Sequence, residues 1–335
     1  MNENPRILVV GFGSVGLRHA QNLAKRGARI TVVDRRSERN GPEGLHLFGF
    51  HTSIESALDV SQYDGAVIAT PTAFHVEDAK KLVKAGCAIL LEKPPAVDYE
   101  SALALAAAEE KAMKPILLGY TWRWWTALQE LRTRLKDGAV GRPYRADFIM
   151  ASHLEDWHPG EPLADFFMSQ ASLGGGALLD ESHWIDQMLW LFGEPTEIAA
   201  DVERISPLKI DCDDHVELRA YYPEGLRARV HLDLYTRPTE RSIAIFGEAG
   251  VIKWEFEHNT IEHYRTHTGI WKKTPFGGVR NDMFDALAGD FLELLDGNSR
   301  PICTIADGLA VMRVIDAARA SQRAGGQRIS VASIA

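Results

Sequence analysis

The stretch Ile7-Leu8-Val9-Val10-Gly11-Phe12-Gly13-Ser14-Val15-Gly16 decides how the chain begins to fold. Its first four residues form a short, wholly apolar run, which is typical of a strand buried on both faces. The glycines that follow have the spacing Gly-x-Gly-x-x-Gly and open a helical pattern that Gly27 closes. Gly11 allows a tight turn, Gly13 lets backbone N–H groups approach a pyrophosphate, and Gly16 lets helix and strand pack closely. All residues from Gly11 to Gly16 are therefore candidates for binding a dinucleotide.

A carboxylate and two arginines follow the next predicted strand, residues 30–33. Asp34 ends this strand, where a carboxylate accepts hydrogen bonds from the ribose hydroxyls of an adenosine. Its negative charge repels the 2′-phosphate of NADP, whereas Arg35 and Arg36 could hold that phosphate. NAD is therefore the expected cofactor, with NADP as the alternative. The simpler interpretation, a glycine turn followed by a solvated aspartate, predicts no cofactor.

Further apolar runs without alternation are separated by helical patterns throughout the first third of the chain. Such strands indicate a parallel sheet covered by helices on both faces, which is a doubly wound α/β fold. In this fold, ligands bind at the carboxyl ends of the strands. The predicted strands cover residues 48–51, 66–69, 88–91 and 116–118, and the predicted helices cover residues 74–84 and 101–113.

The rest of the chain has a different pattern. Period-2 alternation predicts a mostly antiparallel open sheet with one buried face. A glycine-rich break at 174–176 leads into a helix expected to run to about Phe192, and two helices close the chain. We expect a Rossmann domain over residues 1–120 and an α+β domain over residues 121–335. The predicted strands of the second domain cover residues 144–151, 216–220, 230–234, 243–245 and 252–256.

Thr70, Pro71 and His75 follow the strand predicted at residues 66–69. The end of this strand is expected to face the nicotinamide half of the cofactor, because the carboxyl ends of parallel strands share one edge. The three residues are therefore candidates for cofactor binding. The alternative interpretation is a helix-starting turn followed by a surface histidine.

Glu92, Lys93 and Pro94 follow the strand predicted at residues 88–91. Proline disfavours helical geometry at the preceding residue and permits a cis peptide bond. A rigid strand end of this kind suits a lysine whose ammonium group must point at a substrate oxygen. Glu92 and Lys93 are thus candidates for cofactor binding, and Lys93 also for catalysis and substrate binding. The alternative is a lysine that is only an exposed charge.

Asp180, His183 and Asp186 lie three residues apart in the segment that follows the glycines at 174–176. In a continuous helix this spacing places all three on one face. Carboxylates beside a histidine fix its tautomer and raise its basicity, which suits general acid–base chemistry near neutral pH. The alternative is an N-capping Asp180 and a histidine whose hydrogen bonds are satisfied within the structure.

Together these segments resemble the glucose–fructose oxidoreductase / inositol dehydrogenase / rhizopine catabolism (Gfo/Idh/MocA) family over nearly the whole chain. The resemblance includes the glycine stretch 11–16, residues 69–75, residues 92–94, residues 174–186 and the late segment 291–321. The family implies a C-terminal domain that binds substrate and often builds homodimers or homotetramers. It also implies hydride transfer between NAD(P) and a secondary alcohol of a sugar, cyclitol or sugar nucleotide.

The resemblance also implies roles for individual residues. Lys93 would bond the reacting hydroxyl and assist proton transfer, while His183 would be the principal acid–base residue with Asp180 orienting it. All three are candidates for both catalysis and substrate binding. In many family members the aspartate precedes the histidine by four positions, whereas Asp180 precedes His183 by three. This departure leaves open which residue is the base, and whether Asp180 or Glu181 supports it.

Arg123, Trp157 and His158 are the remaining candidates for substrate binding. Arg123 lies where family members often place an arginine near the ligand, and it could hold a polyol or a phosphate. Trp157 and His158 lie in a segment that could cover a sugar. For Arg123, the alternative is a position on the solvent side of a tryptophan-rich core helix.

The composition excludes several classes of protein. Of the 335 residues, 45% are hydrophobic and 25% are charged, so the chain is not largely disordered. Asp and Glu outnumber Lys and Arg by 46 to 37, which argues against a nucleic-acid or anionic-membrane partner. No stretch reaches the ~20 apolar residues of a membrane helix. Three distant cysteines predict a reduced, cytoplasmic protein, and the histidines lack metal-ligand spacing, so no metal is expected.

Two further functions stay open beside the expected dehydrogenase. One is a redox-neutral, NAD-using glycosidase that oxidises and re-reduces its substrate on a trapped cofactor. The other is a non-catalytic, nucleotide-sensing regulator that binds a partner protein. The dehydrogenase is the leading hypothesis, because the lysine and histidine that the chemistry requires are both present.

Overall fold

The computed structural model describes residues 4–35, 42–112, 114–157, 162–295 and 299–334. It divides into two compact units, which are Met1–Thr121 with Arg280–Leu309, and Trp122–Val279 with Ala310–Ala335. The division predicted at residue 120 assigns residues 280–309 to the second domain, whereas in the structure they pack with the first unit. The reason is that helix α8 (Asn281–Leu295) lies against α1 (Ser14–Lys25), with Arg26 binding Asp285 through two hydrogen bonds of 3.1 and 2.8 Å.

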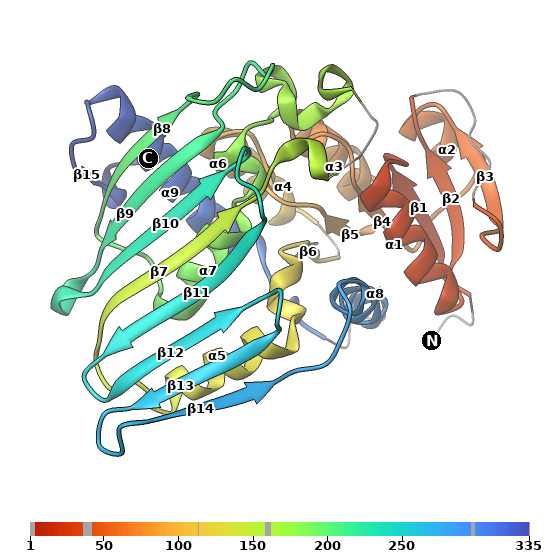
Figure 1. Cartoon of the computed structure of the whole chain (residues 1–335). Helices are drawn as coiled ribbons and strands as arrows, with labels where there is room; N and C mark the ends of the chain where they lie inside the picture. The colour runs from red at the N-terminus through yellow and green to blue at the C-terminus, as the bar shows by residue number, and fades with distance from the viewer. Residues whose placement is uncertain (1–3, 36–41, 113, 158–161, 296–298, 335) are drawn as a thin grey trace. The chain divides into compact units, whose positions relative to one another are not determined.

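The first unit is built on a six-stranded parallel sheet of order β3-β2-β1-β4-β5-β6 (Figure 1). The strand order reverses beside β1, and right-handed crossovers therefore place α1 and α3 on opposite faces of the sheet. This confirms the predicted doubly wound α/β fold. The other elements are β1 (Arg6–Val10), β2 (Arg29–Val33), β3 (Leu47–His51), α2 (Ile54–Val60), β4 (Gly65–Ile68), η1 (Thr72–Phe74), α3 (His75–Lys84), β5 (Ala88–Leu91), α4 (Tyr99–Glu109) and β6 (Ile116–Leu118).

Burial on both faces explains why the strands of this sheet do not alternate. Every residue of β4, β5 and β6 is buried, and in β1 and β2 only the first residue is exposed. Side-chain caps fix where two of the helices begin. Ser53 Oγ accepts the N–H of Ser56 at the start of α2, and Asp98 Oδ1 accepts that of Ser101 at the start of α4.

The second unit contains a nine-stranded sheet of order β14-β13-β12-β11-β7-β10-β9-β8-β15. Only the β7–β10 pair is parallel, which confirms the predicted, mostly antiparallel sheet. β8, β13, β14 and β15 were not predicted, because their sequences alternate weakly. The strands are β7 (Pro143–Ala151), β8 (Glu197–Glu203), β9 (His215–Tyr221), β10 (Arg227–Asp233), β11 (Glu240–Gly247), β12 (Gly250–Glu255), β13 (Thr260–Arg265), β14 (Ile270–Pro275) and β15 (Ile329–Ser330).

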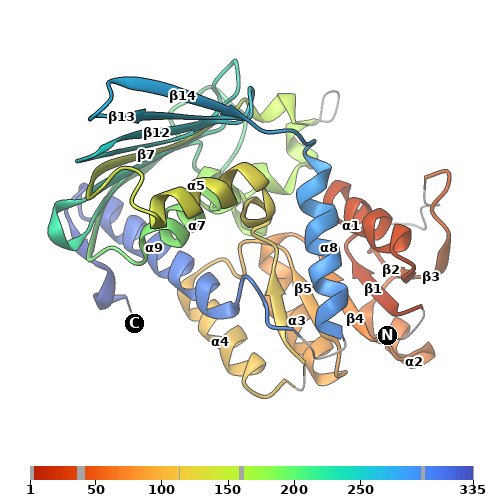
Figure 2. The ribbon, with the colours of Figure 1, turned by 90° about the horizontal axis from the view of Figure 1, so that it is seen from below.

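Helices cover one face of this sheet and leave the other bare (Figure 2). Side chains accordingly alternate between buried and accessible positions along β9 and β10. No helix in the described ranges is long and apolar enough to cross a membrane. The remaining helices of the chain are η2 (Thr121–Trp124), α5 (Thr126–Lys136), η3 (Leu154–Asp156), η4 (Leu163–Asp165), η5 (Phe167–Ser169), η6 (Ala171–Leu173), α6 (Ala177–Asp180), α7 (His183–Phe192), η7 (Pro223–Gly225), α9 (Ile305–Arg323) and η8 (Val331–Ser333).

An aromatic cluster lies between η2, α7 and the sheet. The Trp122 ring packs edge-on against Trp184 of α7 and Trp254 of β12, with ring centroids 5.1 and 5.8 Å apart. All three side chains are buried. Because edge-to-face packing favours defined ring orientations, this cluster fixes the start of α7, which is where His183 lies.

Candidate active site

The loops that follow β1, β4 and β5 carry most of the predicted cofactor-binding residues. The first residue of each loop still donates a backbone hydrogen bond to the neighbouring strand. The sheet therefore fixes the position of that residue. The donors are the N–H groups of Gly11, Ala69 and Glu92, and the acceptors, at 2.8–2.9 Å, are the carbonyl oxygens of Val33, Val10 and Ile68.

The glycine turn after β1 has the shape that a dinucleotide requires. Gly11 has φ +88°, and a Cβ atom there would lie 2.5 Å from the carbonyl oxygen of Ala69. A Cβ atom at Gly16 would collide with the carbonyl oxygen of Gly11, whereas one at Gly13 would meet no atom within 4 Å. Gly13 thus leaves open space at the N-terminus of α1, where the N–H groups can bind a pyrophosphate. The residues present therefore fit a dinucleotide.

Asp34 ties this turn to the end of β2. The backbone N–H of Phe12 donates to Asp34 Oδ2 at 2.9 Å, and both residues are buried. The guanidinium of Arg35, next along the chain, lies 4.1 Å from the centroid of the Phe74 ring. Asp34 therefore stands at the strand end where the sequence predicts it, and contact of Asp34 or Arg35 with a cofactor remains a prediction.

Residues 92–94, called the lysine turn below, follow β5. Lys93 is half-buried, and its peptide bond to Pro94 is cis. Glu92 is buried, and its Oε1 atom lies 2.6 Å from Nε2 of His19, a fully buried residue of α1. His19 was not predicted as a site residue, because its only sequence signal is a polar side chain on the buried face of a helix.

His75 begins α3, as the sequence predicts, but it is buried there. The residue is 1% exposed, and its Nδ1 and Nε2 atoms each lie 2.8 Å from a carbonyl oxygen, of Pro94 and Thr70 respectively. Burial lowers the pKa of the ring. A ring enclosed in this way is not a surface histidine, which contradicts that alternative, and contact of His75 with a cofactor remains a prediction. Thr70 and Pro71 are half-buried and stay candidates.

In the second unit, the loops after the parallel strands β7 and β10 lie side by side, and the segment before β9 joins them to the start of α6. These loops, called the loop edge below, therefore adjoin the start of α6, the short helix that ends at Asp180 just before His183. The bonds that join these segments run from the N–H groups of Leu154, Leu234 and Ala177 to the carbonyl oxygens of Leu234, Asp214 and Asp213, at 2.9–3.0 Å.

The helix predicted to run to Phe192 is broken after Asp180. α6 ends there, α7 begins at His183, and the backbone bonds across the break join residues three apart rather than four. The prediction that Asp180, His183 and Asp186 share one face of a continuous helix is therefore wrong. Asp180 is buried and His183 half-buried, and only His183 and Asp186 lie in the same helix.

Asp213, which was not predicted as a site residue, holds the start of α6. The N–H of Leu178 donates to its Oδ2 atom at 2.8 Å, and a Cβ atom at Gly176 would collide with the carboxylate. Burial raises the pKa of Asp213. The only sequence signal for this contact is the acidic stretch 211–214, which lies far along the chain from α6.

Arg123 forms a buried ion pair with Asp186 of α7. Its Nε atom lies 3.1 and 3.0 Å from the two carboxylate oxygens, and its Nη2 atom lies 2.6 Å from Oδ1. The side chains are 3% and 0% exposed. This contradicts the alternative that Arg123 faces solvent, and contact of Arg123 with substrate remains a prediction. The pair instead holds η2 against the helix that begins with His183.

Trp157 is half-buried at the loop edge, and its indole N–H donates to Ser152 Oγ at 2.9 Å. Ser152 Oγ is in turn 2.7 Å from Thr239 Oγ1, which joins the loops after β7 and β10. The ring is thus fixed, and its contact with substrate remains a prediction. His158, the neighbouring candidate, lies outside the described residues.

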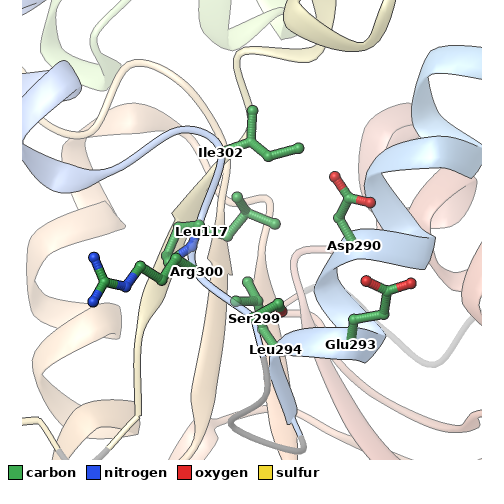
Figure 3. Close-up of a pocket in the computed structure, with 8 residues that line it drawn as sticks. Leu117, Asp290, Glu293, Leu294, Ser299, Arg300 and Ile302 are labelled. Atoms are coloured by element: carbon green, nitrogen blue, oxygen red, sulfur yellow. The ribbon is translucent and has the colours of Figure 1, made fainter.

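A pocket in the first unit is separate from all of these residues (Figure 3). Leu117 of β6 lines it together with Asp290 and Glu293 of α8, and no predicted site residue is among its lining. Within the described ranges, no group of three or more His, Cys, Asp or Glu side chains could hold a metal ion.

Comparisons with known proteins identify two matching family models. Residues 5–120 match the model described as an oxidoreductase family with an NAD-binding Rossmann fold. Residues 128–253 match the GFO/IDH/MocA C-terminal domain.

Relatives of similar length match along nearly the whole chain. The rhizopine catabolism protein MocA of Rhizobium meliloti is 25% identical over 324 residues, covering 93% of each chain. The UDP-N-acetylglucosamine 3-dehydrogenase of Acidithiobacillus ferrooxidans is 28% identical over 319 residues, covering 92% of this chain and 94% of its own. A levoglucosan dehydrogenase solved with NADH and levoglucosan has a TM-score of 0.87 at 21% identity, covering 98% and 99% of the two chains. This last likeness is one of fold.

Two glycine substitutions separate packing from cofactor access. Gly13→Ala adds a methyl group to open space, so we expect weaker NADH binding, by about 10-fold or more, with an unchanged melting temperature. Gly16→Ala must displace the Gly11 carbonyl, so it should lower both the affinity and the melting temperature. Fluorescence titration with NADH and thermal melting measure the two effects. Equal melting temperatures for the two variants would contradict the distinct roles assigned to Gly13 and Gly16.

Breaking the buried ion pair should destabilise the second unit strongly. Asp186→Asn removes a carboxylate charge that the buried Arg123 guanidinium binds, and breaking a buried pair in this way costs ~3–5 kcal/mol of unfolding free energy. Glu194→Gln is the matched control, because it removes a carboxylate from the exposed pair with Arg313 in the same unit. Exposed pairs contribute ~1 kcal/mol or less. Urea unfolding followed by tryptophan fluorescence measures both, and similar losses would show that burial of the first pair is unimportant.

Proposed function

Because this chain belongs to the GFO/IDH/MocA family of NAD-binding oxidoreductases, we propose that it oxidises a secondary alcohol of a sugar or polyol, reversibly and with NAD as the hydride acceptor. The observation that carries the proposal is the position of Lys93. Its turn follows β5 at the carboxyl edge of the sheet whose β1 loop has the glycine geometry for a dinucleotide. Ligands of doubly wound sheets bind at this edge.

We assign the proton chemistry to two residues. NAD, when bound, supplies a nicotinamide ring that accepts a hydride. Lys93 presents an ammonium group, which donates a hydrogen bond to the substrate hydroxyl oxygen and favours loss of its proton. His183 takes that proton on its imidazole as general base, and it returns the proton in the reverse reaction. The half-buried state of both residues suits groups that must meet substrate.

Asp180 and Trp157 are assigned to substrate binding beside His183. Asp180 ends α6, one short break before His183, and its carboxylate is suited to accept hydrogen bonds from sugar hydroxyls or to orient the imidazole. The accessible part of the Trp157 ring offers an apolar face of the kind that packs on a sugar ring. Each assignment is tested by the effect of substitution on KM against kcat.

Charge at the loop edge favours an uncharged substrate. The loops 152–157, 204–214 and 234–239 contain five Asp and Glu against three Lys and Arg, and the adjoining strand ends add the carboxylates of Glu203, Asp233 and Glu240. Of the cations, Arg237 binds Asp156 at 2.7 Å, and Arg204 donates to the carbonyl oxygen of Ile210 at 2.7 Å. A diphosphate or sugar acid would meet repulsion here, whereas a neutral polyol finds many acceptors for its hydroxyl groups. We therefore place neutral sugars and cyclitols ahead of sugar nucleotides.

The deciding experiment is a fluorescence titration of the purified protein with NADH and NADPH. It is repeated with free sugars, inositols and sugar nucleotides, and the same panel is then assayed for NADH formation. Net NADH formation with a polyol supports the dehydrogenase. Glycoside cleavage on retained cofactor without net NADH would indicate the redox-neutral glycosidase, and cofactor binding without any turnover would favour a regulator. Binding of neither nucleotide would overturn the proposal.

Substitution of the two assigned residues should abolish chemistry and spare cofactor binding. Lys93→Ala and His183→Ala are each expected to lower kcat by ~10²-fold or more, because general acid–base groups contribute at least that factor. NADH affinity should change little. Lys84→Ala, an exposed lysine at the end of α3, is the control and should leave kcat unchanged. Unchanged turnover in either variant would remove that residue from the mechanism.

We also propose that the bare face of the nine-stranded sheet joins two copies of the chain, as a homodimer or within a homotetramer. Strand register places Phe246, Val251, Tyr264 and Trp271 in one row across this face. The rings of Tyr264 and Trp271 are in contact, and Trp271 is 43% exposed. A row of large apolar side chains on an open sheet face favours association.

A group of charges on the β9–β10 part of this face is already paired, which lowers the cost of covering it. Burial opposes ionisation of Glu217, but hydrogen bonds from Arg229 and His231 lower its pKa to about 2. Hydrogen bonds to Asp233 and Glu217 raise the pKa of His231 to about 9. These groups thus keep their partners when a second sheet covers them.

A charge in the apolar row should separate the copies. We expect light scattering on a sizing column to give a multiple of the 37.2 kDa chain mass for the unmodified protein. Trp271→Glu should shift this mass towards the monomer, because it places a charge inside the contact. Val60→Glu, on the exposed surface of α2, is the control. A monomeric unmodified protein would contradict the proposal.

The cysteines suit the reducing cytoplasm that we propose as the location of this protein. Burial raises the pKa of Cys87 to about 11 and that of Cys212 to about 12. Cys87 and Cys212 are free thiols, the state that a reducing cytoplasm maintains.

A further inference from the structure

Two buried histidines hold the lysine turn from either side of Lys93. His19 of α1 contacts the side chain of Glu92, which precedes Lys93, with 2.6 Å between Nε2 and Oε1. His75 of α3 contacts the carbonyl oxygen of Pro94, which follows it, with 2.8 Å from Nδ1. Both rings are at most 1% exposed. The backbone of Lys93 is therefore fixed through both of its neighbours.

His75 lies between the lysine turn and the loop after β4. Its Nε2 atom lies 2.8 Å from the carbonyl oxygen of Thr70, on the side of the ring opposite the Pro94 contact. Carbonyl oxygens only accept hydrogen bonds, and a neutral imidazole has a single N–H to donate. A neutral His75 thus bonds one of the two loops, and a protonated one bonds both.

His19 joins the lysine turn to the helix that begins at the glycine turn. It lies on α1 one turn after Gly16, whose close contact with Gly11 fixes α1 on the sheet. The carboxylate that it contacts occupies the space beside Gly119, where an added Cβ atom would lie 3.1 Å from Glu92 Oε1. The position of the lysine turn is therefore tied to the predicted pyrophosphate site.

A lysine needs this support more than a shorter side chain does. Its ammonium group stands at the end of four rotatable bonds, so a displacement of the backbone also displaces the ammonium group relative to the reacting atoms. Misplacement of a catalytic group by about 1 Å can cost ~10²-fold in rate. The strands themselves do not depend on either ring, since the ladder bonds at Ala69 and Glu92 are made by the backbone.

We propose that His19 and His75 are positioning residues for Lys93 in the hydride-transfer reaction, an inference that rests on the proposed function. They act through Glu92 and the Pro94 carbonyl, and neither touches substrate or cofactor. Their substitution should therefore lower kcat while leaving NADH affinity nearly unchanged.

The test compares variants that remove the donors with variants that keep one. His19→Met and His75→Leu remove them, and each should lower kcat by ~10–100-fold with NADH affinity within about 2-fold. His19→Gln keeps an N–H near the Nε2 position and should restore most of the activity. His75→Asn keeps the donor to Pro94 and His75→Gln keeps the donor to Thr70, so the asparagine variant should be the more active.

A buried histidine away from the lysine turn serves as the control. His263 of β13 is 6% exposed, and its Nε2 atom lies 2.9 Å from the carbonyl oxygen of Ala139. His263→Met makes the same kind of change and should leave kcat unchanged. Loss of kcat in His263→Met as large as in His19→Met would assign the effect to general destabilisation and overturn the proposal.

Hydrogen exchange supplies a readout that does not depend on turnover. Backbone amides of residues 91–97 should exchange faster in His19→Met and His75→Leu, and amides of the nine-stranded sheet should not. If the unmodified protein turns over no substrate, the proposed function fails while this measurement still tests the support of the turn. Unchanged exchange in both variants, or unchanged kcat in an active enzyme, would overturn the proposal.

If His75→Leu does not fold, the comparison of His75→Asn with His75→Gln replaces it. Equal activity of these two variants would overturn the role of the Pro94 contact.

Discussion

The first unit depends on the absence of side chains where α1 meets the end of β1. Gly16 lies so close to the Gly11 carbonyl that a methyl group does not fit, and this contact fixes the axis of α1. From that axis follow the open space at Gly13 and the position of His19 against Glu92. One steric constraint therefore sets both the predicted cofactor site and the turn that carries the proposed catalytic lysine.

The second unit relies on a different interaction. The segment with Asp180 and His183 is not part of a sheet and contains a break, so the strand ladder does not position it. Side chains do this instead, as Asp213 binds the start of α6 and Arg123 binds Asp186 in α7. Buried charges are costly unless they are paired, so these contacts have few alternatives. The result is a fixed histidine on an otherwise irregular segment.

Local patterns predicted the fold well, because buried parallel strands and glycine turns have short-range signatures. The doubly wound sheet, the glycine turn and the position of Lys93 after β5 all followed from such runs. The errors concern contacts made over long distances in the chain. The partner of Arg123 is 63 residues away and that of His19 is 73 residues away, and no spacing rule connects them. His75 shows the same limit, since its burial depends on Pro94 in another loop.

A common reason explains why the proposed catalytic residues lie at the ends of elements. Within a strand covered on both faces, such as β4 or β5, backbone groups bond each other and every side chain is buried, which leaves no group to meet a ligand. At an end, the backbone leaves that pattern, so a residue such as Lys93 or His183 can be half-buried and still accessible. Where the backbone no longer makes regular hydrogen bonds, contacts of side chains such as Glu92 and Asp186 must hold the segment in place. Catalysis at the ends of elements therefore requires positioning residues as well as catalytic residues.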